Sequence, residues 1–324
     1  MSKNFMLRSI ALTGATGFVG GGLLKRLASM DWHVRALVRP ASMHKRSQGV
    51  PEWVPGDLED GESLRRLVAG VDAVVHCAGT VRGASLENFE RINVEGVARL
   101  VLAARSQHPA PRFFLISSLA AREPHLSDYA ASKRKGEETL VANAGPLPWV
   151  IFRPPVIYGP GDRELLPLFR WMCRGIAPVF GSAGKRFSLL YVEDMAEAIV
   201  CYLQRGMGWG RSYEVHDGHA GGYSWEDIID AIARMNGRSI YRVKVPVSLV
   251  RLGATLNLAA ARMGNRMPML TPGKVRELTH PDWVGDNTAL TRDTGWIPQV
   301  TLEEGLKQTL RQNRATGGKG SHWT

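Results

Sequence analysis

Cysteine is scarce in this chain of 324 residues, which has only Cys77, Cys173 and Cys201. Three widely spaced thiols indicate neither a disulfide framework nor a metal site, so we expect no metal and a reducing, cytoplasmic location. The sequence also lacks an uncharged apolar run of the ~18 residues that a membrane-spanning helix needs. Its first residues lead directly into an apolar segment, so we expect no signal peptide.

Acidic residues are outnumbered, because 41 Lys and Arg stand against 30 Asp and Glu and give a formal charge of +11. This balance suits anionic small-molecule ligands. The basic residues are spread along the chain without a cluster of stacking aromatics, so we expect no nucleic-acid partner. One apolar segment, 245–263, carries few charges. The favoured interpretation is a helix packed on a substrate lobe, and the alternative is an interfacial helix in peripheral contact with a membrane.

A glycine-rich turn stands near the start of the chain, in the segment Thr13-Gly14-Ala15-Thr16-Gly17-Phe18-Val19-Gly20. It lies between an apolar segment typical of a buried parallel strand and a segment with helical spacing of apolar residues. Gly14 would permit a tight turn, Gly17 would let a pyrophosphate approach the backbone, and Gly20 would let the helix lie close to the sheet. The phosphates would then lie at the positive helix N-terminus. We therefore expect dinucleotide contacts at Gly14, Thr16, Gly17, Phe18, Val19 and Gly20.

The end of the second expected strand bears on which dinucleotide is bound. Residues 33–39 read His-Val-Arg-Ala-Leu-Val-Arg, so Arg39 stands where an NAD enzyme normally has an acid that accepts from the ribose 2′-hydroxyl. A guanidinium suits a 2′-phosphate instead. The sequence therefore favours NADP over NAD, with a solvated basic loop as the alternative interpretation.

Further strands are expected where apolar segments end in small or polar residues. Strands that alternate with helices predict an α/β fold of the Rossmann type, with a doubly wound parallel sheet whose ligands lie at the carboxyl ends of the strands. Asp57 could reach the adenine amino group, and small residues after the fourth strand would lie beside the cofactor. The residues expected at these strand ends are Asp57, Leu58, Cys77, Ala78, Gly79, Ser117 and Ser118.

Tyr129 and Lys133 lie four residues apart, on one face of an expected helix. Hydride transfer at a carbinol carbon needs a group that exchanges the hydroxyl proton, whereas a free tyrosine has a pKa of about 10. The Lys133 ammonium, together with an oxidised nicotinamide, would lower that pKa. Taken alone, such a pair is usually an ordinary surface pair. With the glycine turn upstream and a serine at a strand end between them, we expect it to be catalytic.

Taken together, these motifs resemble the extended short-chain dehydrogenase/reductase superfamily, the NAD-dependent epimerase/dehydratase proteins. The resemblance covers nearly the whole chain. It implies that Ser118 is the active hydroxyl, that Asn93 supports a water relay to Lys133, and that Pro155 and Val156 contact the cofactor. It also implies a homodimer formed through the helices expected at 86–107 and 127–141. The matching segments are Thr13 to Gly20, Gly56-Asp57-Leu58, His76 to Gly79, Asn93 to Gly96, Ile116-Ser117-Ser118, Tyr129 to Lys133, Arg153 to Asp162, Tyr191 to Asp194 and Leu302 to Leu306.

Two departures from the family pattern narrow the reaction. Leu119 and Ala120 follow the active hydroxyl, where sugar-nucleotide dehydratases carry an acid pair. Only 129 − 118 = 11 positions separate Ser118 from Tyr129, which is short for a sugar-nucleotide epimerase. The leading hypothesis is an NAD(P)-dependent oxidoreductase or epimerase acting at a secondary alcohol or ketone of a small molecule, with nucleotide sugars favoured by family weight. The alternatives are a hydroxysteroid dehydrogenase- or dihydroflavonol reductase-like enzyme with a hydrophobic substrate, and a non-enzymatic dinucleotide-binding subunit.

The expected domain layout places a smaller lobe after the Rossmann unit. Residues 1–154 would form the dinucleotide-binding domain, and a segment at about 187–201 would return to its sheet. Residues 155–313 would form mainly the substrate-binding lobe. The glycine-rich segment 314–324 is expected to be a flexible tail.

Overall fold

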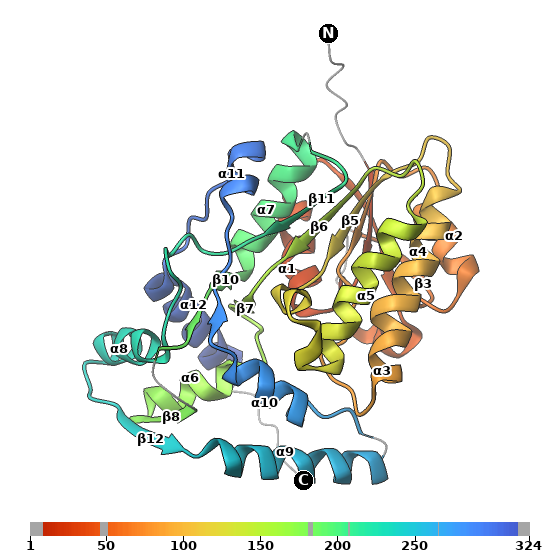
Figure 1. The fold of residues 1–324 in the computed structure, drawn as a ribbon. Coiled ribbons are helices and arrows are strands. Elements are labelled where there is room, and N and C mark those ends of the chain that lie inside the picture. The colour runs from red at the N-terminus through yellow and green to blue at the C-terminus, as the bar shows by residue number, and fades with distance from the viewer. Residues whose placement is uncertain (1–8, 46–50, 181–183, 207, 265, 317–324) are drawn as a thin grey trace.

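The computed structural model describes the chain from Ser9 to Thr316, apart from residues 46–50, 181–183, 207 and 265. The elements group into two layers of structure around a central sheet and a smaller group of helices and short strand pairs beside it (Figure 1).

A parallel sheet of seven strands organises the larger part of the molecule. Its order is β11-β6-β5-β4-β1-β2-β3, and every neighbouring pair is parallel. The chain leaves β1 in one direction through β2 and β3 and returns on the other side through β4, so the order reverses between β1 and β4. This confirms the doubly wound α/β fold. The strands are β1 (Ser9–Thr13), β2 (His33–Val38), β3 (Glu52–Pro55), β4 (Ala73–His76), β5 (Arg112–Ile116), β6 (Trp149–Arg153) and β11 (Arg211–Glu214).

Helices cover both faces of this sheet, because the strands are apolar on both sides. On one face α1 packs against α7, with Leu23 and Ile199 in a common core. On the other face α2, α4 and α5 bury Leu64, Leu100 and Leu140. The helices are α1 (Phe18–Ala28), α2 (Gly61–Val68), α3 (Leu86–Glu90), α4 (Gly96–Arg105), α5 (Asp128–Asn143) and α7 (Val192–Arg205).

The remaining elements form a smaller core of their own, in which Phe169, Ile229 and Ile232 are buried. Three two-stranded parallel pairs belong to this part: β7 with β10, β8 with β12 and β9 with β13. The strands are β7 (Val156–Tyr158), β8 (Ile176–Phe180), β9 (Arg186–Phe187), β10 (Leu189–Tyr191), β12 (Tyr241–Val245) and β13 (Asp282–Trp283). The helices are α6 (Leu166–Cys173), α8 (Trp225–Asn236), α9 (Val247–Met263), α10 (Pro272–Thr279), α11 (Thr288–Thr294) and α12 (Leu302–Thr316).

The path of the chain differs from the sequence prediction in three places. The segment expected to rejoin the main sheet splits, because β10 pairs with β7 outside that sheet while α7 packs on α1. The seventh strand of the sheet is β11, which had no clear signal. Helix α12 extends to Thr316, past the predicted start of the tail at residue 314, and residues 317–324 lie outside the described range.

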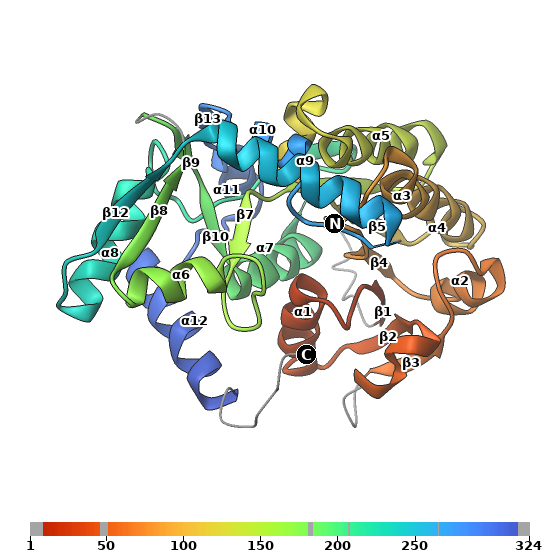
Figure 2. The same cartoon turned by 90° about the horizontal axis from the view of Figure 1, so that it is seen from below.

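Helix α9 lies along the lower edge of the molecule in Figure 1, and a view from below shows it crossing that side (Figure 2). Only Ala254 and Ala261 of this helix are buried. The favoured interpretation of a packed helix therefore holds for one side of α9 only. In the described part of the chain no helix is both long enough and apolar enough to span a bilayer.

Candidate active site and cofactor cleft

The glycine turn between β1 and α1 is tight enough to exclude side chains at two positions. Gly14 has φ +74°, and a Cβ there would lie 2.7 Å from the backbone nitrogen of Ala78. A Cβ on Gly20 would lie 2.2 Å from the Gly14 carbonyl oxygen. Gly17, which is exposed, begins α1 without a side-chain cap, and the first turn has no acidic residue. The backbone N–H groups at this helix N-terminus are thus available to an anion, as a dinucleotide pyrophosphate requires.

Polar contacts join this turn to the end of β4. Oγ1 of Thr13 lies 2.7 Å from Nδ1 of His76, and the same hydroxyl oxygen accepts from the Ala78 N–H at 3.2 Å. Burial lowers the pKa of His76 to about 3, so its imidazole is neutral. The pair therefore holds the two strand ends together at the reversal point of the sheet, which is the ligand-binding edge of such folds. Cys77 follows β4 and is half-buried, rather than lying within the strand, and Gly79 is two residues further on.

The residues expected around the adenosine half occupy different environments. Arg39 follows β2 directly and is exposed. The Asp57 carboxylate accepts from the backbone N–H groups of Glu59 and Asp60, at 2.8 and 3.1 Å. Leu58 is buried in the core. Thr16, Phe18 and Val19 are half-buried beside the glycine turn.

The two serines after β5 have separate roles. Ser117 is buried and donates to the Glu137 carboxylate at 2.5 Å, and Nε of Arg153 donates to the same carboxylate at 2.9 Å. Ser118 is more exposed and caps the following turn, where its Oγ accepts from the Ala120 N–H. Ser117 is thus engaged with Glu137, whereas Ser118 lies within hydrogen-bonding reach of Tyr129.

Helix α5 brings Tyr129 and Lys133 to the same edge of the sheet. The Lys133 Nζ donates to the Ile116 carbonyl oxygen at 2.8 Å, at the end of β5. Burial lowers the pKa of Lys133 to about 8. Burial raises the pKa of Tyr129 to about 12, and a hydrogen bond with Ser118 opposes that rise. Burial and the Glu277 carboxylate thus hold the phenol pKa above its ordinary value, rather than below it as expected, and Tyr129 keeps its proton at neutral pH.

Asn93 lies in a short π-helical turn, Arg91–Glu95, between α3 and α4. Its side-chain amide accepts from the Thr80 N–H and donates to Ser132 at 2.9 Å. The π-helical turn and α5 approach each other so closely here that a Cβ on Gly136 would lie 2.2 Å from the Asn93 carbonyl oxygen. Asn93 therefore joins the loop after β4 to α5, beside Lys133. Such π-helical turns are frequent at functional sites.

On the opposite side of the cleft, the chain leaves β6 through a pair of prolines. Pro155 is half-buried and Val156, which begins β7, is exposed. The carbonyl oxygen of Pro154 accepts from the Leu119 N–H at 2.8 Å, which ties this segment to the turn after Ser118.

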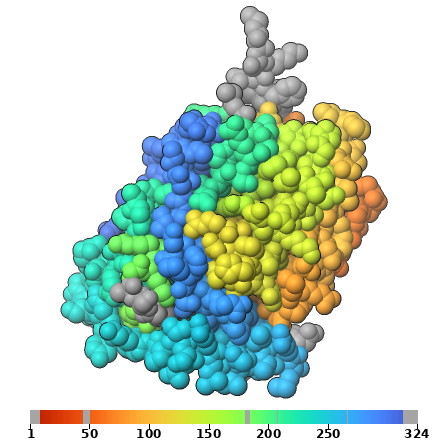
Figure 3. Space-filling model, viewed as in Figure 1, coloured from red at the N-terminus to blue at the C-terminus, as the bar shows by residue number. Residues whose placement is uncertain are grey.

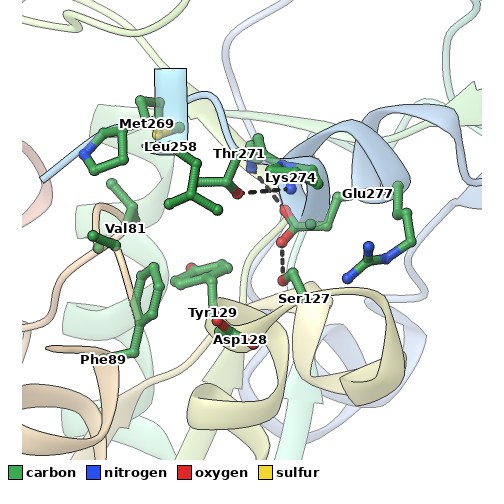
Figure 4. Close-up of a pocket in the computed structure, with 16 residues that line it drawn as sticks. Val81, Phe89, Ser127, Asp128, Tyr129, Leu258, Met269, Thr271, Lys274 and Glu277 are labelled. Carbon is green, nitrogen blue, oxygen red and sulfur yellow. Dashed lines mark hydrogen bonds and ion pairs between the residues drawn. The ribbon is translucent and has the colours of Figure 1, made fainter. Parts of the chain in front are cut away.

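A pocket opens between the Tyr129 ring and the segment that joins α9 to α10 (Figure 4). Phe89 packs edge-on against Tyr129, with ring centroids 6.1 Å apart. The Lys274 Nζ lies 5.8 Å from the centroid of the Tyr129 ring and forms an ion pair with Glu277 at 2.8 Å. Glu277 also accepts from Ser127, the N-cap of α5. The apolar lining consists of Val81, Ala84, Phe89, Leu258, Pro268, Met269 and Pro272.

Sequence reasoning missed this wall of the pocket. Lys274 and Glu277 lie about 150 residues beyond Ser127, and no motif connects them. The Gly273 backbone approaches so closely that a Cβ there would lie 2.8 Å from the Ser127 Cβ. The one available signal was the arrangement Thr271-Pro272, in which an N-cap threonine precedes a proline and predicts the start of α10.

A match to a family model bears out the resemblance. Residues 10–215 match the NAD dependent epimerase/dehydratase family. Ceramide reductase from Caulobacter vibrioides is 36% identical over 311 residues, which cover 95% of this chain and 95% of the relative. The 2-alkyl-3-oxoalkanoate reductase of Stenotrophomonas maltophilia is 29% identical and covers 94% and 99% of the two chains.

A likeness to solved structures extends over the same length. UDP-glucuronic acid 4-epimerase from Bacillus cereus, in complex with NAD, superimposes with a TM-score of 0.73 at 19% identity. The match covers 95% of this chain and 99% of the epimerase. At this identity the likeness shows a shared fold.

Proposed function

This chain belongs to the NAD-dependent epimerase/dehydratase family, and from that premise we propose that it reduces a ketone on a long-chain, lipid-like substrate. The observation that carries the proposal is the pocket next to Tyr129, whose lining combines one continuous set of apolar side chains from α3, α9 and the α9–α10 segment with polar and charged groups of α5 and α10. Two relatives with reductase names, ceramide reductase and 2-alkyl-3-oxoalkanoate reductase, favour the same class. An apolar pocket with a few polar groups is the usual design for such a ligand.

The charged groups of the pocket support a neutral substrate. Lys274 is neutralised by Glu277, and Arg276 donates through Nε to the Leu126 carbonyl oxygen at 2.7 Å. Asp128 and Glu277 also place two carboxylates in the pocket lining, which disfavours a pyrophosphate there. A nucleotide sugar would bring two phosphates to this site, so the pairing favours the hydrophobic substrate that family weight alone places second.

Tyr129, Ser118 and Lys133 would perform the proton chemistry. Hydride would come from a nicotinamide cofactor when one is bound. The Tyr129 hydroxyl would give its proton to the carbonyl oxygen as the alcohol forms, and Ser118 would donate a hydrogen bond to that oxygen. The high pKa of Tyr129 suits a proton donor. Lys133 would hold the ribose hydroxyls and place positive charge near the phenolate that remains.

The glycine turn and Arg39 would hold the cofactor. The turn has no room for side chains at Gly14 and Gly20, and its helix N-terminus has no acidic residue to repel phosphate. The exposed Arg39 guanidinium would bind a 2′-phosphate, so we propose NADP as the favoured cofactor.

Epimerisation of a nucleotide sugar is the second candidate, because the family model that matches most of the sheet is named for epimerases. A panel assay separates the two. Oxidation of NADPH should accompany a long-chain N-acyl amino ketone and not UDP-glucose, and the product should be the secondary alcohol by mass spectrometry. Interconversion of UDP-glucose and UDP-galactose without net cofactor oxidation would contradict the proposal.

A homodimer through α4 and α5 also remains a proposal. Leu102 on α4 and Val141 on α5 are exposed apolar residues on that side of the molecule. Light scattering should give the dimer mass for the wild type and the monomer mass for Leu102→Glu. A wild-type monomer at micromolar concentration would be evidence against this arrangement.

A further inference from the structure

Helix α9 turns its apolar side away from the protein. Leu249, Leu252 and Leu256 are 61%, 57% and 62% exposed, and Met263 is 87% exposed. Their spacing of three, four and seven residues places all four on one face of the helix. Ordinary surface helices have their polar face outward, so this orientation needs a partner.

The inner side of the same helix is made of smaller residues and the pocket wall. Ala254 and Ala261 are buried, and Leu258 lines the pocket. The Asn257 side chain donates to the Leu270 carbonyl oxygen at 2.8 Å, and Arg262 donates to Ala84 at 3.2 Å. These contacts fix the rotation of α9, so the leucines cannot turn inward without losing them.

The charge around α9 has one sign. No acidic residue lies between Asp230 and Glu277, whereas nine Lys and Arg do. Arg251 and Arg262 lie about three helical turns apart on one flank of the apolar face. Within the described residues, no carboxylate forms an ion pair with Arg251 or with Lys244 of the neighbouring strand β12.

Strand β12 extends the exposed apolar surface. It leads directly into α9, and its Tyr241 is 74% exposed. Figure 2 shows β12 and α9 in line across the side seen from below, and Figure 3 shows residues of this range forming the lower edge of the molecule. Apolar residues and basic residues therefore share one side.

We propose that α9 and β12 dock this protein on an anionic lipid bilayer, with the leucine face of α9 in the interfacial region. Arg242 of β12 is paired with Glu226 and Asp230 of α8, so the cations that remain for lipid are those of α9 and Lys244. Exposed apolar side chains beside such cations are complementary to acyl chains beneath anionic headgroups. Since no described helix can cross a bilayer, the contact is peripheral. A second copy of this chain would bring two cationic surfaces together, which is unfavourable.

The docking surface goes beyond the reaction and adds a route for its substrate. Leu258 and Met269 line the pocket from the same segment that carries the exposed leucines. The helix that docks on the bilayer would therefore also form part of the pocket wall, on its inner side. If the protein has a different substrate, the docking surface and its test are unaffected.

Cosedimentation with vesicles tests the proposal without substrate. The full chain should bind vesicles of phosphatidylglycerol and phosphatidylcholine and bind pure phosphatidylcholine less. Leu249→Gln/Leu252→Gln/Leu256→Gln should weaken binding to the anionic vesicles on the order of 100-fold, because three leucines no longer enter the bilayer. Lys244→Gln/Arg251→Gln should weaken it roughly tenfold.

Matched control variants distinguish binding through this surface from non-specific hydrophobic or electrostatic binding to vesicles. Trp171→Gln/Ile297→Gln changes exposed apolar residues elsewhere, and Lys25→Gln/Lys307→Gln removes the same charge from other helices. Both should bind as the wild type does, and circular dichroism should show all variants folded. Wild-type protein that stays in the supernatant with anionic vesicles would overturn the proposal, as would undiminished binding by the triple variant. A wild-type dimer that the triple variant converts to a monomer, without vesicle binding, would show that a second copy covers this face instead.

Discussion

The edge of the main sheet and the α9–α10 segment form opposite walls of one site, yet they are built differently. At the sheet edge the functional groups are held by contacts within the first half of the chain, such as Ser117 with Glu137, 20 residues apart, and Thr13 with His76, 63 residues apart. The α9–α10 wall is joined to α5 by contacts between residues 150 positions apart, Ser127 with Glu277 and Leu126 with Arg276. We therefore propose that the sheet edge carries the chemistry common to the family and that the α9–α10 wall sets the choice of substrate.

Loss of the proposed proton donor, Tyr129, should have the largest effect on turnover. Tyr129→Phe should lower turnover by ~10²- to 10⁴-fold and leave cofactor binding nearly intact. Lys133→Met should lose both turnover and cofactor affinity, because the ammonium is proposed to hold the ribose. Steady-state kinetics and calorimetric cofactor titration would measure the two effects.

The pH dependence distinguishes the two residues. Lys133 has its pKa lowered to about 8, so reduction by the wild type should slow as the pH rises above that value and the ammonium is lost. Tyr129, with its pKa raised to about 12, keeps its proton throughout this range. Burial penalises charged Lys133 below pH 8, so Lys133→Met should melt at the same or a higher temperature at pH 7.

A Tyr129→Phe variant with wild-type turnover would refute the mechanism.

A change in the α9–α10 wall should have a smaller effect on the reaction and a larger one on substrate choice. Glu277→Gln removes the charge that pairs with Lys274 and weakens the hydrogen bond from Ser127, so KM for a neutral long-chain ketone should rise several-fold while turnover changes less. Binding of an anionic analogue should improve. Glu138→Gln removes an exposed carboxylate from the same helix as Tyr129 and is the matched control. A several-fold fall in kcat with an unchanged KM would place Glu277 with the catalytic groups instead.

A substitution at Arg39 should change the cofactor preference and have the smallest effect on the kinetics of the substrate. Arg39→Asp should reverse an NADPH preference, because the guanidinium that binds the 2′-phosphate becomes an acid that accepts from a ribose hydroxyl. Calorimetric titration with NADPH and NADH checks this. Wild-type affinity that is equal for both, or higher for NADH, would show that Arg39 does not select the cofactor.

The same contrast explains what could be predicted from sequence. The parallel sheet and the family were predictable, because glycine spacing, apolar strands and the Tyr129-Lys133 pair are local patterns. Strand β11 was missed because Arg211 and Ser212 are exposed in a short edge strand and give no apolar run. The pKa of Tyr129 depends on burial, which spacing does not report.

The α9–α10 wall shows why the rest could not be predicted. Helix α9 was predicted at 245–263 and lies at Val247–Met263, but its rotation depends on contacts with Ala84 and Leu270. An apolar helix gives the same pattern whether its leucines face inward or outward. Glu277 enters the site only through a residue about 150 positions away. The roles of the individual site residues remain predictions, which the substitutions above test.

The dependence of kcat/KM on alkyl chain length tests the central claim most directly. For a series of soluble ketones that differ only in the length of the chain, NADPH oxidation by the wild type should give a kcat/KM that rises with each methylene until the pocket is filled. The rise should be roughly fourfold per methylene at full burial, from about 0.8 kcal/mol each. The Tyr129→Phe variant should be slow at every length. A flat dependence on chain length, or a higher kcat/KM for UDP-glucose than for every ketone in the series, would contradict the account.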